Sequence, residues 1–341
     1  MYEDQALQTN LDELSRCEER RRSPDYGKNL SPIQKTDAAL KESVYNALWK
    51  DDVLRTLEYY EIDVQVRNGV VYLYGHIVGS SSQNRIRNAI QGIPGIVEIK
   101  NNLVLDDTLT SEVARALGDL EHTYNCKFFT GVSHGVVVLH GEVSRLDVRL
   151  SAEQCAANHP KVRGVINSIR VSGVGPGMQD YRLVQPPVGK KMYFLDGISG
   201  LVSQVVVNPN NRQVVAMVLQ GHFDESRRKH NYSNFSDGPS AEQLLIVSVN
   251  VVRHVTKNSG FLTIRSTDST KYQEFDASLF TTPDEEWLPP YPYCPDEVLF
   301  PIAYQQEDKT FENVSNQVSS KPKTVMQKMS EELLYNDSLG G

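Results

Sequence analysis

The residues that could do chemistry in this sequence are cationic and aromatic side chains suited to binding. Arginine holds phosphate and carboxylate groups through several hydrogen bonds at once, and tyrosine adds apolar contact with a polar hydroxyl. Six such side chains form a candidate binding surface: Arg85, Arg87, Arg145, Arg149, Tyr72 and Tyr74. Four arginines beside an anionic lipid would support only about millimolar affinity, so a membrane surface is a weak expectation for this set.

No pattern indicates a catalytic centre, a cofactor or a metal site, so we do not expect an enzyme. The sequence lacks GxSxG, HExxH and phosphate-loop motifs, and His134 and His140 have no partner residues at useful spacing. A GxGxG-like run at residues 172–178 could suggest a nucleotide site, but Pro176 favours an extended linker. Acid pairs at element boundaries are expected to cap helices or to lie in solvated turns. These pairs are Asp51-Asp52, Asp106-Asp107 and Glu285-Glu286.

Composition is typical of an acidic globular protein with polar ends. The 341 residues carry a formal net charge of -8, which disfavours nucleic-acid binding except through a ribonucleoprotein complex. Arg20-Arg21-Arg22 is the densest basic run, but two glutamates precede it and predict a charge-balanced helix end. The apolar runs have the length of strands, well short of the roughly 20 residues of a membrane span.

The cysteines and the first residues suggest a compartment. Cys17, Cys126, Cys155 and Cys294 lie far apart without a CxxC motif, a pattern that predicts free thiols in a reducing environment. The acidic start of the chain has no apolar segment behind it, so no secretory signal is expected. We therefore expect a cytoplasmic protein, including one peripheral to the inner face of a membrane.

The candidate side chains belong to a pattern of helix and strand that must position them. Apolar residues at helical spacing over 37–48 precede two alternating runs around Asn68-Gly69, a sequence typical of a tight type I′ hairpin turn. A second helix over 82–91 and a third strand over 96–105 follow. The unit therefore has the order α-β-β-α-β.

The same unit occurs a second time. A shift of 66 residues superposes Gly69–Gly75 (GVVYLYG) on Gly135–Gly141 (GVVVLHG) and continues without a gap to Leu103 on Ile169. The opening helix needs a shift of 69, which places a slightly shorter loop in the second copy. Two glycines, a proline, an asparagine and the apolar strand positions all coincide, so this is a tandem repeat.

Alternation gives the central strand of each copy two faces. One face is expected to be core, and it carries Val71, Leu73, Ile77, Val137, Leu139 and Val143. Gly75 and Gly141 interrupt this face, where a helix packed closely above is favoured over ligand contact. The opposite face, with Tyr72 and Tyr74, is unusually apolar. Either the two copies bury these faces against each other, or the face is an interaction surface.

A different pattern begins at residue 188. Five or six short strands are expected up to residue 280, interrupted by a polar insertion at 224–241, which indicates a small barrel or sandwich. Past residue 280 the periodicity is lost, apart from a weak amphipathic helix near 325–334. A short helix over 7–22 is the one element expected in the leading tail.

The chain is thus predicted to be α+β, with two repeats, a small all-β domain and disordered termini. The predicted segments are a tail that is disordered or holds a short helix (1–36), the first repeat (37–106), the second repeat (107–173), a linker (174–187), the β-domain (188–280) and a Pro- and aromatic-rich segment with a disordered tail (281–341).

Both predicted units resemble known families. The repeat resembles the BON domain, with a Gly-x-Val-x-Leu-x-Gly strand, a helix and a last strand of the type Val162-Arg-Gly-Val-Ile-Asn167, although the first copy has Glu98 where the second has Gly164. Residues 188–266 resemble a PRC-barrel in the run Gly189-Lys-Lys-Met-Tyr, an Asp-Gly turn and valine-rich strands. Departures are the polar insertion and Val247-Ser248, where many members have proline.

The resemblances imply binding and bring no catalytic motif. BON domains are thought to bind phospholipid surfaces or envelope components and often occur as pairs in stress-related proteins. PRC-barrels dock onto larger assemblies such as a ribosome maturation complex. We therefore expect a scaffold protein that docks on a protein or ribonucleoprotein assembly, with a protein partner or self-association. The alternative is a peripheral phospholipid- or envelope-binding protein, and a cryptic enzyme rests only on the GxGxG-like run.

Overall fold

The computed structural model describes residues 17, 32–173, 183–223, 242–256, 258–268, 272–284 and 286–302. Four predicted features lie wholly or mostly outside these residues: the helix over 7–22 apart from Cys17, the GxGxG-like run beyond Gly173, the insertion at 224–241 and the helix near 325–334. None of the described helices is long and apolar enough to cross a membrane.

Both repeats have the predicted order of elements, and the α+β fold class is confirmed. The first repeat contains α2 (Pro32–Lys50), α3 (Asp52–Leu57), β1 (Ile62–Arg67), β2 (Val70–Ile77), α4 (Ser80–Ile90) and β3 (Glu98–Leu105). The second contains α5 (Asp106–Tyr124), β4 (Lys127–Ser133), β5 (Val136–Val143), α6 (Leu146–Ala157) and β6 (Gly164–Val171). In each sheet the middle strand pairs antiparallel with the first and parallel with the third.

The hairpin turns follow the sequence prediction and extend it. Asn68 and Gly69 have φ of 50° and 79°, the left-handed backbone that a type I′ turn requires at both central residues. The second copy makes the same turn with His134 and Gly135, at φ of 50° and 76°. Histidine is one of the few side chains besides glycine and asparagine enriched at positive φ.

The predicted core of each repeat is confirmed. All six apolar positions on the inner face of the central strands are at most 3% exposed. The glycines within that face, however, have a different neighbour from the one predicted. A Cβ on Gly75 would overlap the carbonyl oxygen of Glu61, and one on Gly141 would lie 2.7 Å from that of Lys127. The close neighbour is therefore the backbone at the start of the first strand, not a helix.

The C-terminal unit is a nine-stranded sheet that curls into a half-barrel. Its main strand order is β11-β12-β7-β8-β9-β10-β13, with β15 attached to β8 and β14 to β15. The bounds are β7 (Lys191–Tyr193), β8 (Ser199–Val207), β9 (Val214–Gly221), β10 (Gln243–Ser248), β11 (Val252–Val255), β12 (Ser259–Leu262), β13 (Tyr272–Glu274), β14 (Phe280–Thr281) and β15 (Val298–Pro301), with short 3₁₀ turns at Val249–Val251, Ala277–Leu279 and Pro295–Glu297.

The half-barrel continues past its predicted end at residue 280. Strand β15 pairs in parallel with β8, and its residues Val298 and Phe300 belong to the core of the half-barrel together with Tyr293. A parallel partner far along the chain leaves no hairpin signal in the sequence. The described residues of the Pro- and aromatic-rich segment, up to Pro301, are therefore part of the half-barrel.

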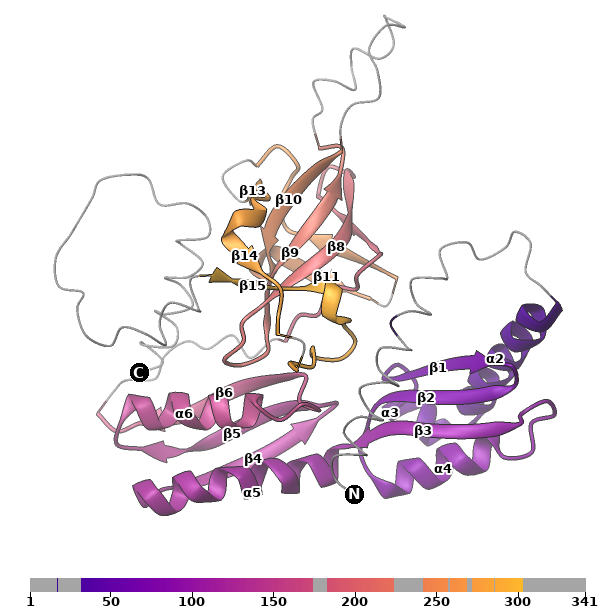
Figure 1. Cartoon of the computed structure of the whole chain (residues 1–341), viewed down its shortest axis with the longest axis horizontal. Helices are drawn as coiled ribbons and strands as arrows, with labels where there is room; N and C mark the ends of the chain where they lie inside the picture. Colours follow the sequence, from indigo (N-terminus) through magenta and orange to yellow (C-terminus); the bar gives the residue numbers. More distant parts are fainter. Residues whose placement is uncertain are drawn as a thin grey trace, which may run out of the picture.

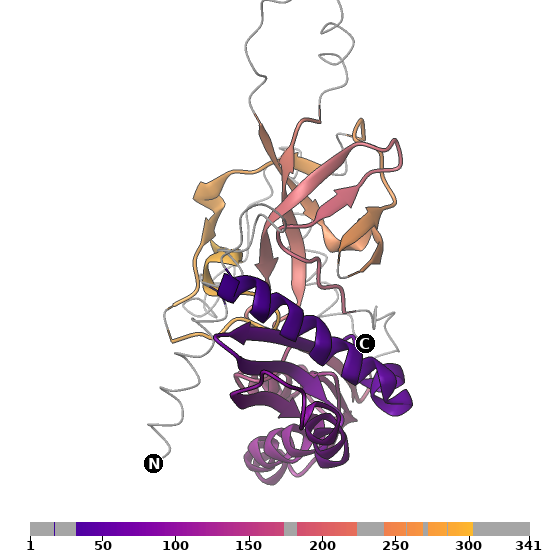
Figure 2. The same cartoon turned by 90° about the vertical axis from the view of Figure 1, so that its right-hand side faces the viewer.

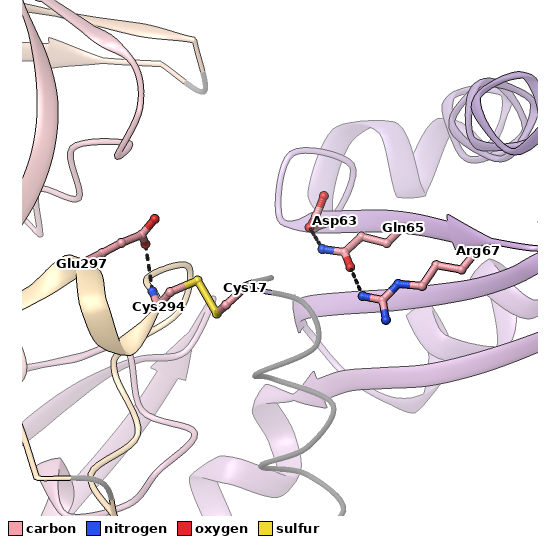
Figure 3. Close-up of a disulfide and its surroundings, with 6 residues drawn as sticks. All are labelled: Cys17, Asp63, Gln65, Arg67, Cys294 and Glu297. Atoms are coloured by element: carbon pink, nitrogen blue, oxygen red, sulfur yellow. Dashed lines mark hydrogen bonds between the residues drawn. A yellow bond between two sulfur atoms is a disulfide. The ribbon is translucent and has the colours of Figure 1, made fainter. Parts of the chain in front are cut away.

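The two repeats lie side by side, with the half-barrel over the second repeat and to one side of the first (Figure 1). In the turned view the half-barrel stands above the indigo helix α2 (Figure 2). Figure 3 shows a disulfide between Cys17 and Cys294, whose Cα atoms are 5.7 Å apart across 277 residues of sequence. The expectation of free thiols is therefore wrong for these two cysteines, because sequence distance does not report spatial distance. Cys126 and Cys155 are free.

Candidate binding surface

The four arginines of the predicted surface are not equivalent in the structure. Arg149 is 1% exposed and donates to the backbone carbonyl of Asn167, so its assignment to the surface is wrong. It lies on the inward side of α6, which the low sequence amphipathicity of that helix did not reveal. Arg85 is paired with Asp51 at 3.2 Å, and Arg145 is paired with Asp147. Arg87 is exposed on α4.

The two predicted tyrosines are already engaged within the first repeat. Tyr74 is 1% exposed, so it is not available at the surface. Tyr72 is partly buried and stacks parallel to Tyr74, with ring centroids 6.5 Å apart. The cations of Arg67 and Lys100 lie 5.0 Å and 5.4 Å from the centroid of the Tyr72 ring. The π-face of this ring is thus used inside the chain.

The helix-free face of the sheet differs sharply between the two repeats. In the first, Gln65, Tyr74 and His76 are 7%, 1% and 2% exposed. Their counterparts 66 residues later, Gly131, His140 and Glu142, are all exposed. The two faces therefore do not bury each other, and that alternative is wrong. The first face is covered within the molecule and the second is open.

We define the open face as the side of the second sheet formed by Phe129, Gly131, Val138, His140, Ile166 and Ser168. Phe129 lies opposite His140, which lies opposite Ser168 on the next strand. In the same way Gly131 lies opposite Val138, which lies opposite Ile166. Phe129 is 60% exposed, whereas Val138 and Ile166 are partly buried around a hollow of about 420 Å³. His140, Ser168 and Arg170 complete the lining of this hollow. A large exposed aromatic on the same face is unusual for a surface that has no partner.

Gly131 deepens the open face. A Cβ at this position would meet no atom within 4 Å, and the backbone there has no positive φ that would demand glycine. The equivalent residue of the first repeat is Gln65, so a side chain fits the strand. Gly131 therefore leaves open space above the sheet, although the fold does not require glycine at this position.

Both edges of this sheet have backbone donors that are already occupied. On β4, the N–H of Phe128 donates to a carboxylate oxygen of Glu121 at 2.7 Å. On β6, the N–H of Ile169 donates to the side chain of Asn167 at 3.2 Å, and that of Val165 donates to the carbonyl of Asn211 at 2.8 Å. Occupied donors make an edge a poor template for an added strand.

Asp106 organises the junction between the repeats, which corrects its predicted role as a cap. Its carboxylate accepts from the N–H groups of His134 and Gly135 at 2.5 Å and 3.0 Å. Asp37, 69 residues earlier, makes the same contacts with Asn68 and Gly69 at 2.8 Å and 2.9 Å. Each repeat thus anchors its hairpin turn on the opening helix. The other cap prediction holds for Asp51, which accepts from two N–H groups of α3.

A buried polar cluster extends from Asp106 across the junction. His76 lies 3.4 Å from Asp106 through Nδ1, and its ring packs against Gly135, where a Cβ would overlap it. Burial lowers the pKa of His76 from its usual 6.5, although Asp106 acts in the opposite direction. Arg163 crosses the same junction and pairs with Glu61 at 2.6 Å.

Arg212 fastens the half-barrel to the second repeat. It is 2% exposed and donates to the carbonyl oxygens of Val162 and Leu288 at 2.6 Å and 2.7 Å. Its guanidinium lies 4.8 Å from the centroid of the Trp287 ring. Burial lowers its pKa to about 10, so it stays charged at neutral pH. These buried groups bond to one another and to backbone, which is the arrangement of a structural joint.

A second hollow, of about 790 Å³, lies between α2 and α4 of the first repeat. Polar side chains line it, including Asn46, Lys50 and Asn88. The Arg85–Asp51 pair closes one side. Within the described residues no group of three or more metal-ligating side chains occurs.

The sequence-based selection included both tyrosines of the first repeat and did not include the aromatic residue that is exposed on the second. The chosen tyrosines lie on the covered first face, while Phe129 and Gly131 on the open second face were not selected. The signal in the sequence was the alternation along the strand, which places Phe129 on the face opposite to Phe128. Alternation does not report which of the two faces another part of the chain covers.

Comparison with known proteins identifies the repeats. No curated protein matches the chain. Two solved structures show weak similarity: CdsD, a structural protein of the type III secretion system of Chlamydia trachomatis (11% identity, 39% of this chain and 61% of that chain, TM-score 0.32), and the C-terminal domain of CdsD (12%, 37% and 63%, 0.31). This chain thus spans about three fifths of the length of each. Residues 36–107 and 105–173 each match the family model of the BON domain.

Proposed function

We propose that this protein is a non-enzymatic scaffold that docks on a protein or ribonucleoprotein assembly through the open face of its second BON repeat. The observation that carries the proposal is the asymmetry between the repeats. The first face is covered, while the second exposes Phe129 and has a hollow lined by Val138, Ile166 and three polar side chains. BON domains form a binding family, and a buried joint holds this face at a fixed position relative to the half-barrel.

The half-barrel gives the scaffold a second docking unit in this proposal. Its sequence resembles a PRC-barrel, a unit that attaches to larger assemblies. Arg212 ties the half-barrel to the repeat, so a partner seated on the open face would have a fixed orientation relative to it.

Site-specific photo-crosslinking in cells tests the proposal. A benzophenone amino acid replaces Phe129, and the matched control replaces Leu57, an exposed apolar residue of α3 that is 51% exposed. We expect discrete protein adducts on irradiation from position 129 and not from position 57. The same diffuse products from both positions would contradict docking through the open face.

A peripheral lipid-binding role is the second candidate, favoured by the exposed Arg87 and by the BON family. Arg149 is buried, and Arg85 and Arg145 are paired with aspartates, so fewer positive charges face outward than the sequence implied. We expect weak, salt-sensitive co-sedimentation with anionic liposomes, and further loss with Arg87→Glu. Binding that survives physiological salt would raise this role above the scaffold.

The compartment remains a proposal as well. The sequence favoured the cytoplasm, whereas the Cys17–Cys294 disulfide weighs towards an oxidising environment, where such bonds persist. Peptide mapping of the protein isolated under thiol-blocking conditions decides between them. A linked peptide pair containing both cysteines would remove the cytoplasmic expectation, and two alkylated thiols would restore it.

A further inference from the structure

We propose that the occupant of the open face is an amphipathic helix of a partner protein, with acidic residues at one end. This inference rests on the proposed docking role and names the chemistry of the partner. Three occupants of a sheet face are physically reasonable: a second copy of the chain, an added strand and a helix. Dimensions, edge bonding and charge separate them.

The open face is too small for a second copy. Three strands about 4.8 Å apart, over about seven residues at about 3.3 Å each, give a face of roughly 14 by 23 Å. The area is therefore roughly 330 Å², well below the roughly 800 Å² that each partner of a stable complex buries. A symmetric pair formed through this face alone would not persist at ordinary protein concentrations. A partner protein that also docks on the half-barrel, as the proposed function has it, gains contact area beyond this face.

An added strand is disfavoured by the bonding of the sheet edges. Strand addition takes its affinity from backbone hydrogen bonds along an edge. The donors at Phe128, Val165 and Ile169 are occupied by a glutamate, a backbone carbonyl and an asparagine. These bonds occupy the β6 edge at two positions and the β4 edge at its start, whereas the face between the edges stays open.

A helix matches the face in length, width and relief. A helix about 10 Å wide covers most of the sheet, and about 15 residues at 1.5 Å each span its 23 Å length. The notch at Gly131 lies between Val138 and the exposed Phe129 ring. One bulky apolar side chain of the helix would fill this notch, and its neighbours one turn away would contact Ile166 and Phe129.

Charge defines the polarity of the partner. One end of the face carries the cross-strand row Lys127, Glu142 and Arg170. Glu142 accepts from the hydroxyl of Ser172 at 3.1 Å, and the Lys127 ammonium lies 5.6 Å from the centroid of the Phe129 ring. Two cations against one carboxylate leave this end positive. The end of the helix above it should therefore carry acidic residues.

The test uses the full chain and a fluorescent 18-residue peptide with leucines at i, i+3, i+4 and i+7 and glutamates at one end. Fluorescence anisotropy measures binding to the wild type, to Gly131→Gln and to the control Leu57→Ser. Gly131→Gln installs the residue of the first repeat, so the strand keeps its conformation, which circular dichroism verifies. We expect at least tenfold weaker binding for Gly131→Gln and no change for the control.

Several results would overturn the inference. A scrambled peptide that binds as tightly, or a wild-type affinity in Gly131→Gln, would show that the notch does not receive a helix. A concentration-dependent dimer in sedimentation that Gly131→Gln abolishes would assign the face to a second copy. Crosslinking from position 129 separates the two proposals. Discrete adducts without peptide binding would leave the scaffold role standing and remove the helix, whereas failure of both experiments would remove both.

Discussion

At the scale of single residues, one carboxylate per repeat connects the opening helix to the hairpin turn. Asp37 and Asp106 make the same two hydrogen bonds, but only Asp106 also contacts a residue of the other repeat, His76. Because both repeats have the contact between this carboxylate and the hairpin turn, we regard it as part of the repeated fold. The additional contact of Asp106 with His76 links the second repeat to the first.

This pair allows a matched experiment. Asp37→Ala removes two charge-assisted bonds to a partly exposed turn, and we expect a loss of about 1 to 2 kcal/mol in the free energy of unfolding. Asp106→Ala removes the same bonds in a buried site and also the partner of His76, so we expect about 3 kcal/mol or more. Urea denaturation measures both. Equal losses would mean that the His76 contact adds nothing.

His76 should make stability depend on pH. Burial lowers its pKa, while Asp106, Glu61 and Arg163 also act on it. The unfolded chain therefore takes up a proton near pH 6.5, where the folded chain does not, and stability falls as the pH drops through this value. We expect His76→Gln to flatten the decline between about pH 7 and pH 5, a range set by the histidine pKa. An unchanged slope in His76→Gln would contradict this prediction.

At the scale of elements, the sequence pattern predicted correctly those features that depend on residues close together in the sequence. Period and turn residues were sufficient for the α-β-β-α-β order and for the core positions of β2 and β5, because each depends on neighbours in sequence. The features that depend on packing between elements were missed: strand β15 beside β8, the backbone contact at Gly75 and the burial of Arg149. Hydrophobic period and turn residues report which face of an element is apolar, and they do not report what packs against it. The open face was missed for the same reason.

Gly75 and Gly131 lie in equivalent sheets, but only the first is a position where the backbone requires glycine. Gly75 has φ of 120°, and a Cβ would overlap the Glu61 carbonyl, so Gly75→Ala should cost several kcal/mol or prevent folding. Gly131→Ala meets open space and should change stability by less than about 1 kcal/mol. Thermal unfolding compares them. A strongly destabilised Gly131→Ala would show that the fold requires glycine at this position. It would also weaken the inference that the space above Gly131 receives a helix.

At the scale of the whole molecule, the repeats and the half-barrel are joined by buried polar contacts and a disulfide. Arg163 reaches from the second repeat to Glu61 of the first and to the backbone carbonyl of Tyr291. Cys294, three residues further along the chain, is bonded to Cys17. These contacts converge near the covered face of the first repeat. In the described part of the chain, the sheet face of the second repeat is therefore open and that of the first is inside.

Arg212 tests whether this joint makes the molecule one cooperative unit. Arg212→Lys keeps the charge and the strained φ of 60°, since both residues have a Cβ, but it loses the planar fork that reaches several carbonyl oxygens at once. A buried cation with fewer acceptors is costly, by about 2 to 4 kcal/mol, so the half-barrel should separate from the second repeat. Calorimetry should then show two transitions in place of one, whereas the exposed Arg265→Lys should keep the wild-type profile. A single unshifted transition in Arg212→Lys would mean that the remaining contacts, among them the bond of Val165 to Asn211, hold the two units together without the guanidinium.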